Sequence, residues 1–452
     1  MKLPLRPPDP DAHLREVLAR PDAAARLSAI LANSPGPAPG GKYRHWDTFR
    51  HLAATDGLSA EERWLAIKLA RRQLYQILPL TDSRSESFRF ALPTPALEML
   101  HVIDRDASGT IQVSEEVTNP HTRDTYLIKS LVEEAITSSQ LEGASTTRQV
   151  AKEMLKTGRE PRDRSEKMIL NNYNAMLFMR RLVKEDLTPS TVFELQRILT
   201  EGTLDTPDAA GRFRRLDEPI VIEDEIGTIL HVPPSARELD RRLQGMCDFA
   251  NGKSPSGFIH PVVRAITLHF WLAYDHPFVD GNGRTARALF YWSMAREGYW
   301  LCEFISISRI LKKARGQYAR AFLYTETDEN DLTYFLLNQM GVVQRAIRDL
   351  HSYLARKQAE LRRTQVLLSR DTRLRNELNH RQLALLNHAL KSPDATYTLT
   401  SHRRSHDISY ETARTDLTQL TRRGLLIQSK RGREFIFEPS PDLRQRIAAP
   451  AK

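Results

Sequence analysis

The sequence predicts a mainly α-helical protein: a helical bundle carrying one β-hairpin, followed by a small winged helix-turn-helix unit. Helical periodicity of apolar residues runs with few breaks from about 126 to 347. Residues 219–233 interrupt it with two β-branched arms around an acidic, glycine-containing turn, which is typical of a hairpin. At 380–438 two helical patterns precede a second hairpin with a basic tip.

Residues 1–90 are expected to form a peripheral N-terminal arm and a helical extension. Residues 1–40 are rich in proline and alanine, and the run 34–41 is dense in helix breakers, so this arm is expected to be poorly ordered or peripheral. A helix start signal near Ser59 and helical periodicity then predict a helix over 58–78.

The segment 91–352 carries most of the predicted helices. An apolar stripe predicts a helix over 126–141, with Gly143 suited to cap its C-terminal end. Further helices are expected at 165–184, 188–202, 235–251, 261–275, 284–297 and 331–352. Because an isolated hairpin is marginal in water, the 219–233 hairpin must rest on this bundle.

The C-terminal region is expected to be a separate unit. Residues 353–378 are dense in Arg, Lys, Gln and Leu and predict a helical connector. Residues 379–440 then form the winged helix-turn-helix unit, in which the helix over 409–423 is the candidate recognition helix. A tail, 441–452, follows.

Composition and charge narrow the functional classes. The chain has 452 residues, 40% hydrophobic and 27% charged, which is typical of soluble proteins of two or three domains. No apolar run approaches the ~20 residues that span a bilayer, and the N-terminus lacks the apolar core of a secretion signal. Cys247 and Cys302 have no metal-ligand spacing, so a reducing cytoplasm is expected. The net charge of +10 is partly local, because 401–435 holds eight Lys or Arg against four Asp or Glu.

Residues 104–115 match the spacing of an EF-hand calcium loop, including glycine at its sixth position and glutamate at its twelfth. Pro120 interrupts the required exit helix, and 110–113 alternates like a strand. A glycine-containing turn between two strands is therefore favoured over a calcium site.

Residues 276–287 combine groups suited to a nucleotide's phosphates. His276 can take a proton near neutral pH, and Asp280 offers oxygen ligands to Mg²⁺. The Gly-Asn-Gly turn that follows can aim successive N–H groups at an anion, and a helix beginning there adds its dipole. Arg284 and Arg287 are three apart, so on that helix they would share a face. Each residue alone has an ordinary structural explanation; the combination does not.

The run His276-Pro277-Phe278-Val279-Asp280-Gly281-Asn282-Gly283-Arg284-Thr285-Ala286-Arg287 resembles the motif of the Fic family, and every defined position is matched. The resemblance extends over about 90–350. Other segments that look like family positions are Gly211–Arg214, His231–Pro234, Phe258–Pro261 and Ala265–His269.

This resemblance implies a helical bundle with a hairpin flap, and transfer of AMP from ATP to a Tyr, Thr or Ser hydroxyl of a target protein. His276 would take the proton from that hydroxyl, and Asp280 would hold Mg²⁺. The implied phosphate ligands are Gly281, Asn282, Gly283, Arg284 and Arg287, with Asn282 also contacting the α-phosphate. Tyr318 is a weaker candidate for the adenine pocket, where an ordinary core tyrosine is equally expected. Target segments would pair with the flap residues Thr228, Ile229, Leu230 and His231.

A second motif concerns regulation. Ser138 and Glu142 are four apart, so they lie on one helical face just before Gly143. Unaided, this pattern indicates a surface glutamate beside a capping glycine. It resembles, however, the inhibitory helix motif of the Fic family, which implies that Glu142 pairs with Arg287 and occupies the position of the γ-phosphate.

Alternative functions remain for the site at 276–287 and for the C-terminal unit. The same site could remove AMP, with Glu142 positioning a water, or transfer another nucleotide or a phosphate. The chain could also act as a DNA-binding regulator through 380–438, with contacts from Arg403, Arg404, Arg414 and Arg431. Winged helices also bind proteins or dimerise, so a homodimer is left open. The modified hydroxyl could also belong to the protein itself, so self-modification is left open too.

Overall fold

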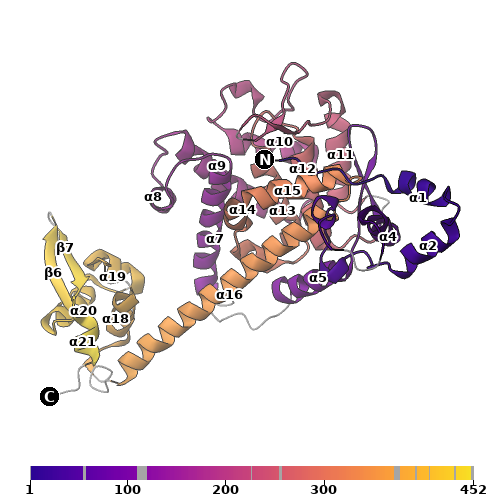
Figure 1. Ribbon diagram of the computed structural model, residues 1–452. Helices are drawn as coiled ribbons and strands as arrows, with labels where there is room; N and C mark the ends of the chain where they lie inside the picture. Colours follow the sequence, from indigo (N-terminus) through magenta and orange to yellow (C-terminus); the bar gives the residue numbers. More distant parts are fainter. Residues whose placement is uncertain are drawn as a thin grey trace. The chain divides into compact units, whose positions relative to one another are not determined.

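The computed structural model describes residues 2–53, 57–108, 120–224, 226–253, 257–370, 377–391, 394–406, 408–431 and 434–448. The chain divides into two compact units, Met1–Leu350 and His351–Lys452 (Figure 1). Helices dominate the described residues, with a few short strands, and the predicted mainly α-helical class is confirmed.

The elements of the first unit are mostly helices. They are α1 (Pro10–Leu18), α2 (Ala23–Ala32), α3 (Trp46–Phe49), α4 (Ala60–Arg72), α5 (Thr94–Ala107), α7 (Pro120–Leu141), α8 (Arg148–Thr157), α9 (Arg164–Arg181), α10 (Pro189–Thr200), α11 (Leu239–Ala250), α12 (Pro261–Asp275), α13 (Asn282–Arg296), α14 (Ile307–Lys313), α15 (Arg315–Thr327) and α16 (Thr333–Arg370), which continues into the second unit. The strands are β1 (Gln76–Thr81), β2 (Ser87–Phe90), β3 (Ile222–Glu223) and β4 (Ile229–His231). None of the helices among the described residues is both long and apolar enough to cross a bilayer.

The centre of this unit is the pair α12 and α13, which pack along each other. Most side chains of α12 are buried, because its sequence is apolar on nearly every face. An aromatic cluster brings three distant elements together on α12, where the Phe270 ring lies 5.3 Å from Phe88 of β2, 5.1 Å from Phe322 of α15 and 5.2 Å from Phe335 of α16. The C-terminal end of α12 is therefore held from several sides.

The N-terminal residues differ from the prediction of a poorly ordered arm. Helices α1 and α2 pack with α4 around a small core that includes Val17, Ile30 and Leu65 (Figure 1). The Asp9 side chain caps α1 by accepting from two backbone N–H groups, and Pro10 fits the first helical position. The predicted helix over 58–78 ends at Arg72, and an unpredicted antiparallel hairpin, β1–β2, follows it.

The candidate calcium loop is not supported where it can be followed. Its first residues, Asp104 to Ala107, belong to the last turn of α5. Asp104 instead accepts hydrogen bonds from the Tyr299 hydroxyl (2.7 Å) and lies 3.1 Å from Nε2 of His260. Residues 109–115 of the candidate loop lie outside the described residues. Pro120, expected to interrupt a helix, begins α7.

The predicted 219–233 hairpin is present as β3 and β4, paired antiparallel. Asp224 stabilises its turn by accepting from the N–H groups of Ile226 (3.1 Å) and Thr228 (2.9 Å). The strands are only two and three residues long, so the hairpin depends on contacts with α12 and α15 made through His231.

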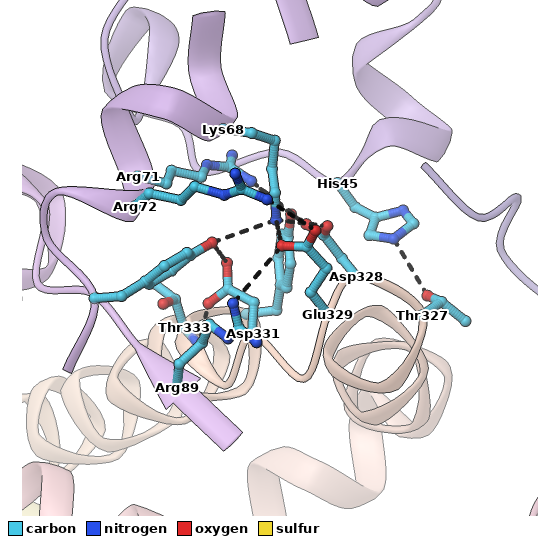
Figure 2. Close-up of polar contacts among 12 residues, drawn as sticks. His45, Lys68, Arg71, Arg72, Arg89, Thr327, Asp328, Glu329, Asp331 and Thr333 are labelled. Carbon is cyan, nitrogen blue, oxygen red and sulfur yellow. Dashed lines mark hydrogen bonds and ion pairs between the residues drawn. The ribbon is translucent and has the colours of Figure 1, made fainter. Parts of the chain in front are cut away.

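A buried polar network fixes the N-terminal residues to the turn between α15 and α16 (Figure 2). The Lys68 ammonium lies 2.8 Å from Asp328, and Arg71 donates to the Tyr334 hydroxyl (2.7 Å), whose own hydrogen bond goes to Asp328 (2.7 Å). Asp331 accepts from Tyr43 (2.5 Å) and from Tyr75 (2.8 Å). The two cations and two carboxylates of this network are almost completely buried.

Lys68→Met is expected to lower the free energy of unfolding by about 3–5 kcal/mol, because it leaves Asp328 charged, buried and without its closest cation. Urea unfolding followed by circular dichroism measures this loss. Lys152→Met is the matched control: Lys152 is exposed and 3.7 Å from Glu133, so its loss should change stability by less than about 1 kcal/mol. Equal effects of the two substitutions would contradict the structural role of the network.

The second unit has its own core and follows the expected order of helix, helix and hairpin. Its elements are α18 (His380–Lys391), β5 (Tyr397–Thr398), α19 (Leu399–His406), α20 (Tyr410–Arg422), β6 (Leu426–Arg431), β7 (Glu434–Pro439) and α21 (Leu443–Ala448). The sheet order is β5-β7-β6, and all pairs are antiparallel. Asp416 of α20 ties the three main helices together by accepting from Asn379 (2.7 Å) and Arg381 (2.8 Å) and contacting His402 (3.1 Å). The prediction missed α19, β5 and α21.

Candidate active site

The loop between α12 and α13 carries the motif residues, and its backbone is unusual. His276 ends α12 in the left-handed region, with φ 44° and ψ 56°. Gly281 precedes α13 with φ 88°, and a Cβ there would lie 3.0 Å from Thr200 of α10. Position 281 therefore requires glycine both for its torsion and for its packing.

Asn282 holds this loop in shape. Its side-chain oxygen accepts from the Phe278 N–H (3.0 Å), and its amide donates to the Phe278 carbonyl (2.8 Å). The fully buried Phe278 ring packs near Phe193 and Phe213. In this structure the Asn282 side chain thus serves the loop itself, and the expectation that Asn282 contacts an α-phosphate stays a prediction.

His276 has the geometry of a neutral base. Its Nδ1 lies 3.2 Å from the Ala273 carbonyl, and since a carbonyl only accepts, Nδ1 carries the hydrogen. Nε2 is then the basic nitrogen. Burial lowers the pKa of His276 to about 4, so the ring is uncharged at neutral pH.

Arg284 has other partners than Arg287 in this structure. Its side chain is fully buried and donates to the Leu199 carbonyl (2.9 Å) and to Asp280 Oδ2 (3.0 Å). It thus anchors the Asp280 carboxylate to the end of α10, and the expectation that Arg284 reaches outer phosphates stays a prediction. The three-residue spacing predicted that both arginines share one side of the helix. In the structure Arg284 bonds to α10 and Arg287 bonds to α7.

Asp280 is the carboxylate of the loop. Its side chain is 39% exposed, and its Oδ1 accepts from the Gly281 N–H at 2.5 Å. The described residues contain no group of three or more His, Cys, Asp or Glu able to enclose a metal. A lone, partly exposed carboxylate suits Mg²⁺, which is commonly held by one or two carboxylates together with substrate phosphates.

Arg287 is paired with the C-terminal end of α7. Its guanidinium donates to Glu142 Oε1 (2.8 Å) and to the Ser138 hydroxyl (2.9 Å) and carbonyl (3.2 Å). Arg287 is 2% exposed and Glu142 is 32% exposed. A Cβ on Gly283 would lie 2.2 Å from the Glu142 carboxylate, so that carboxylate rests directly on the first turn of α13. The predicted pair of Glu142 and Arg287 is present.

Further contacts, which the sequence did not reveal, hold α7 in this position. The buried Glu134 accepts from the Tyr291 hydroxyl (2.9 Å), from Ser306 (2.7 Å) and from Ser308. Near the end of the helix, Gln140 accepts from Lys312 at 2.6 Å. Periodicity marks Glu134 only as a charged residue on a helix, because its partners lie more than 150 positions away.

Two more side chains that sequence reasoning missed support the loop from outside. Gln196 of α10 donates to the Asp280 carbonyl (3.0 Å) and accepts from the Gly211 N–H (2.5 Å). Arg214 donates through Nε to the His276 carbonyl (2.9 Å) and also to the Pro234 carbonyl. The segment Gly211–Arg214 was singled out by resemblance, but Gln196 carried no signal at all.

Tyr318 of α15 lies in an aromatic environment. Its hydroxyl is 2.9 Å from Nε2 of the fully buried His269, and its ring is 5.2 Å from Phe322. Its contacts fit the core tyrosine that was the alternative to an adenine-pocket residue. The flap residues Thr228 to His231 lie in and beside β4, where Ile229 is half exposed and His231 is buried.

In the second unit, Arg403 lies on α19 and Arg414 on α20, and both are exposed. The side chains of Arg404 and Arg431, which were the other candidates for DNA contacts, lie outside the described residues.

Comparison with known proteins supports the motif assignment. Residues 186–294 match the Fic/DOC family. The protein adenylyltransferase Fic of Nematostella vectensis is 34% identical over 116 residues, which cover 25% of this chain and 24% of that protein. The protein of the same name from Drosophila grimshawi is 28% identical over 243 residues, covering 52% of this chain and 48% of the relative. The chain thus spans half or less of the length of these curated relatives.

Partial similarity to two solved structures of Fic proteins is also found. A Fic family protein from Desulfovibrio desulfuricans G20 is 15% identical, with a TM-score of 0.49, over 76% of this chain and 94% of its own. Fic-1 from C. elegans is 18% identical, with a TM-score of 0.47, over 77% of this chain and 97% of its own.

Proposed function

We propose that this chain, which contains a Fic domain at residues 186–294, is a protein adenylyltransferase that moves AMP from ATP to a Tyr, Thr or Ser hydroxyl of a target protein. The observation that carries the proposal is the loop 276–281, which places a neutral histidine beside the N-terminal end of α13. Relatives named protein adenylyltransferase support the same activity.

The mechanism follows from the loop geometry. Nε2 of His276 takes the proton from the target hydroxyl as that oxygen attacks the α-phosphorus of ATP, and pyrophosphate leaves. The first N–H groups of α13, at Asn282 and Gly283, have no acceptor inside the helix and face the phosphates. Arg287 binds the outer phosphates once its present partner moves. Mg²⁺ bound at Asp280 would supply positive charge to the phosphate oxygens. Arg284 acts through Asp280, because it donates a hydrogen bond to that carboxylate and orients it.

We also propose that the structure represents an inhibited state. The Glu142 carboxylate holds Arg287 and lies against Gly283, where the outer phosphates of ATP would bind. Negative charge already fills this position, so a triphosphate is excluded or held in an unproductive pose. Removal of AMP by the same site, with Glu142 orienting a water, is the alternative use of this geometry.

Mass spectrometry of Glu142→Gly protein, incubated with Mg²⁺ and each nucleoside triphosphate in turn, tests the proposed reaction. The expected product is self-modified protein that carries one or more AMP groups with ATP and none with the other nucleotides. A phosphate or another nucleotide as the added mass would replace the proposed donor. Loss of AMP from a modified target, without any transfer, would favour the reverse reaction.

We further propose that the second unit binds duplex DNA through the exposed face of α20 and the adjoining basic residues. Arg403, Arg414 and Lys430 are all exposed. In a mobility shift with the full chain, Arg403→Ala/Arg414→Ala is expected to weaken binding about tenfold and to reduce its salt dependence. Arg446→Ala, which removes an arginine paired with Asp442, is the control. Equal binding by all three proteins would exclude this face.

Both cysteines, Cys247 and Cys302, are buried and unpaired. This supports placing the protein in a reducing compartment such as the cytoplasm.

A further inference from the structure

One flap residue is held in a way that the proposed reaction does not require. Nδ1 of His231 lies 2.7 Å from Glu326 Oε2, and Nε2 lies 2.8 Å from the Tyr274 carbonyl. Neither acceptor can donate when Glu326 is ionised, so both ring nitrogens carry hydrogen and His231 is an imidazolium. Burial alone would lower the pKa of His231, but the hydrogen bond and negative charge of Glu326 raise it.

The charged surroundings of His231 come from three elements. Glu326 belongs to α15, Asp275 to α12, and Arg242 of α11 donates to Asp275 at 2.8 and 2.6 Å. His276 follows directly after Asp275. With Asp275 already neutralised by Arg242, Glu326 is the carboxylate that directly balances the charge of His231.

Glu326 is itself fixed by residues before position 91, here called the N-terminal extension. Around the end of α15, His45 stacks on Tyr324 with ring centroids 4.3 Å apart, and its Nε2 lies 3.2 Å from the Thr327 hydroxyl. Lys68 pairs with Asp328, the residue that follows α15 (Figure 2). The residues on both sides of Glu326 are thus anchored to the N-terminal extension.

The turn after α15 also needs this extension. Glu329 and Asn330 both have positive φ, 54° and 56°, which residues other than glycine rarely adopt. The Asn330 side chain donates to Asp82 (3.1 Å), and its carbonyl accepts from the Arg89 N–H (3.1 Å). Glu329 lies 3.1 Å from Lys68. Two successive left-handed residues persist here because the N-terminal extension supplies their partners.

We propose that Glu326 is a positioning residue of the transfer site. From the end of α15, fixed by the N-terminal extension, it holds His231 of the flap against the Tyr274 carbonyl, two residues before His276. The ion pair between Glu326 and His231 then sets both the orientation of the catalytic loop and the position of the flap. The kinetic part of this inference rests on the proposed transferase function.

Two substitutions separate the charge of Glu326 from its anchoring. In Glu326→Ala the flap loses its anchor. In Glu326→Gln the amide can still donate to Nδ1 of a neutral His231 whose Nε2–H keeps its bond to Tyr274. On the Glu142→Gly background, the alanine variant is expected to lose at least about tenfold in kcat, with the KM for ATP within about twofold. The glutamine variant should keep kcat within about threefold at pH 7.5.

The pH profile adds a readout that a merely structural role would not move. The positive charge of His231 lowers the pKa of His276, so its loss in Glu326→Gln should move the acidic limb of the kcat profile to higher pH. Glu98→Gln, at an exposed position of α5, is the control and should leave both kcat and the limb unchanged. An alanine variant with unchanged kcat, or a glutamine variant with an unmoved limb, overturns the proposal.

Histidine-selective ¹⁵N NMR tests the ion pair without any activity. At pH 7.5 the His231 signals, assigned with His231→Gln, should show two protonated nitrogens in the parent protein and one in Glu326→Gln. A neutral His231 in the parent protein overturns the inference even if transfer is observed. If Glu142→Gly transfers nothing while His231 is an imidazolium, the proposed function has failed and the ion pair stands.

Discussion

Glu142→Gly is expected to raise the rate of AMP transfer by roughly 10- to 100-fold. Glu142 accepts a charge-assisted hydrogen bond from the buried Arg287, and such bonds contribute about 1.5–3 kcal/mol. Removing the carboxylate frees the guanidinium and empties the space above Gly283. Because Glu142 lies just beyond the end of α7 at Leu141, glycine there leaves the helix intact.

Self-modification with radiolabelled ATP measures this rate. Glu133→Gln is the control, since Glu133 lies on the same helix but pairs with Arg148 at its surface. Its rate should equal that of the parent protein. If Glu142→Gly is no faster than this control, Glu142 does not inhibit the site.

His276→Asn should reduce transfer by about 10²- to 10⁴-fold, the usual contribution of a positioned general base. Asparagine is chosen because His276 has a φ of 44°, a left-handed conformation that asparagine tolerates and alanine does not. Binding of ATP and thermal unfolding should therefore stay close to the parent values. His276→Ala should be equally inactive but less stable.

Activity of Glu142→Gly against pH provides an independent check on His276. Burial lowers the pKa of this histidine to about 4, so its basic form persists from neutral pH down to about that value. Activity that depends on His276 should therefore stay level from about pH 8 to pH 5.5, with no loss near the ordinary histidine pKa of 6.5.

For the substitution experiment, undiminished modification by His276→Asn would exclude His276 as the base.

Local patterns were enough to predict the core of the fold and most of the catalytic loop. The helix expected at 261–275 has those bounds in the structure, because its apolar pattern and the motif after it both mark its limits. The hairpin at 219–233 was equally clear from its β-branched arms. The pairing of Glu142 with Arg287 joins residues 145 positions apart, and only the family resemblance predicted it.

The remaining features depend on partners that periodicity does not reveal. Lys68 and Arg71 are charged residues on a helix, and nothing local indicates that both are fully buried. Arg284 and Arg287 have the same residue type and helix, yet one bonds to α10 and the other to α7. The N-terminus was expected to be poorly ordered or peripheral because it is rich in proline and alanine, and its few core residues, such as Val17 and Ile30, are far apart in the sequence.

Gly283 gives the proposed inhibited state a further property. The carboxylate of Glu142 belongs to the same chain as the site, so ATP would compete with an intramolecular group for Arg287. The effective concentration of that group does not change when the protein is diluted. Raising the nucleotide level is then a weak means of activation. Replacing Gly283 with a larger residue would displace the Glu142 carboxylate. It would also obstruct the phosphates of ATP, because both would occupy the space above the Cα of Gly283. Activation that preserves catalysis therefore has to act on α7, through the contacts of Glu134 and Gln140 that keep this helix in place.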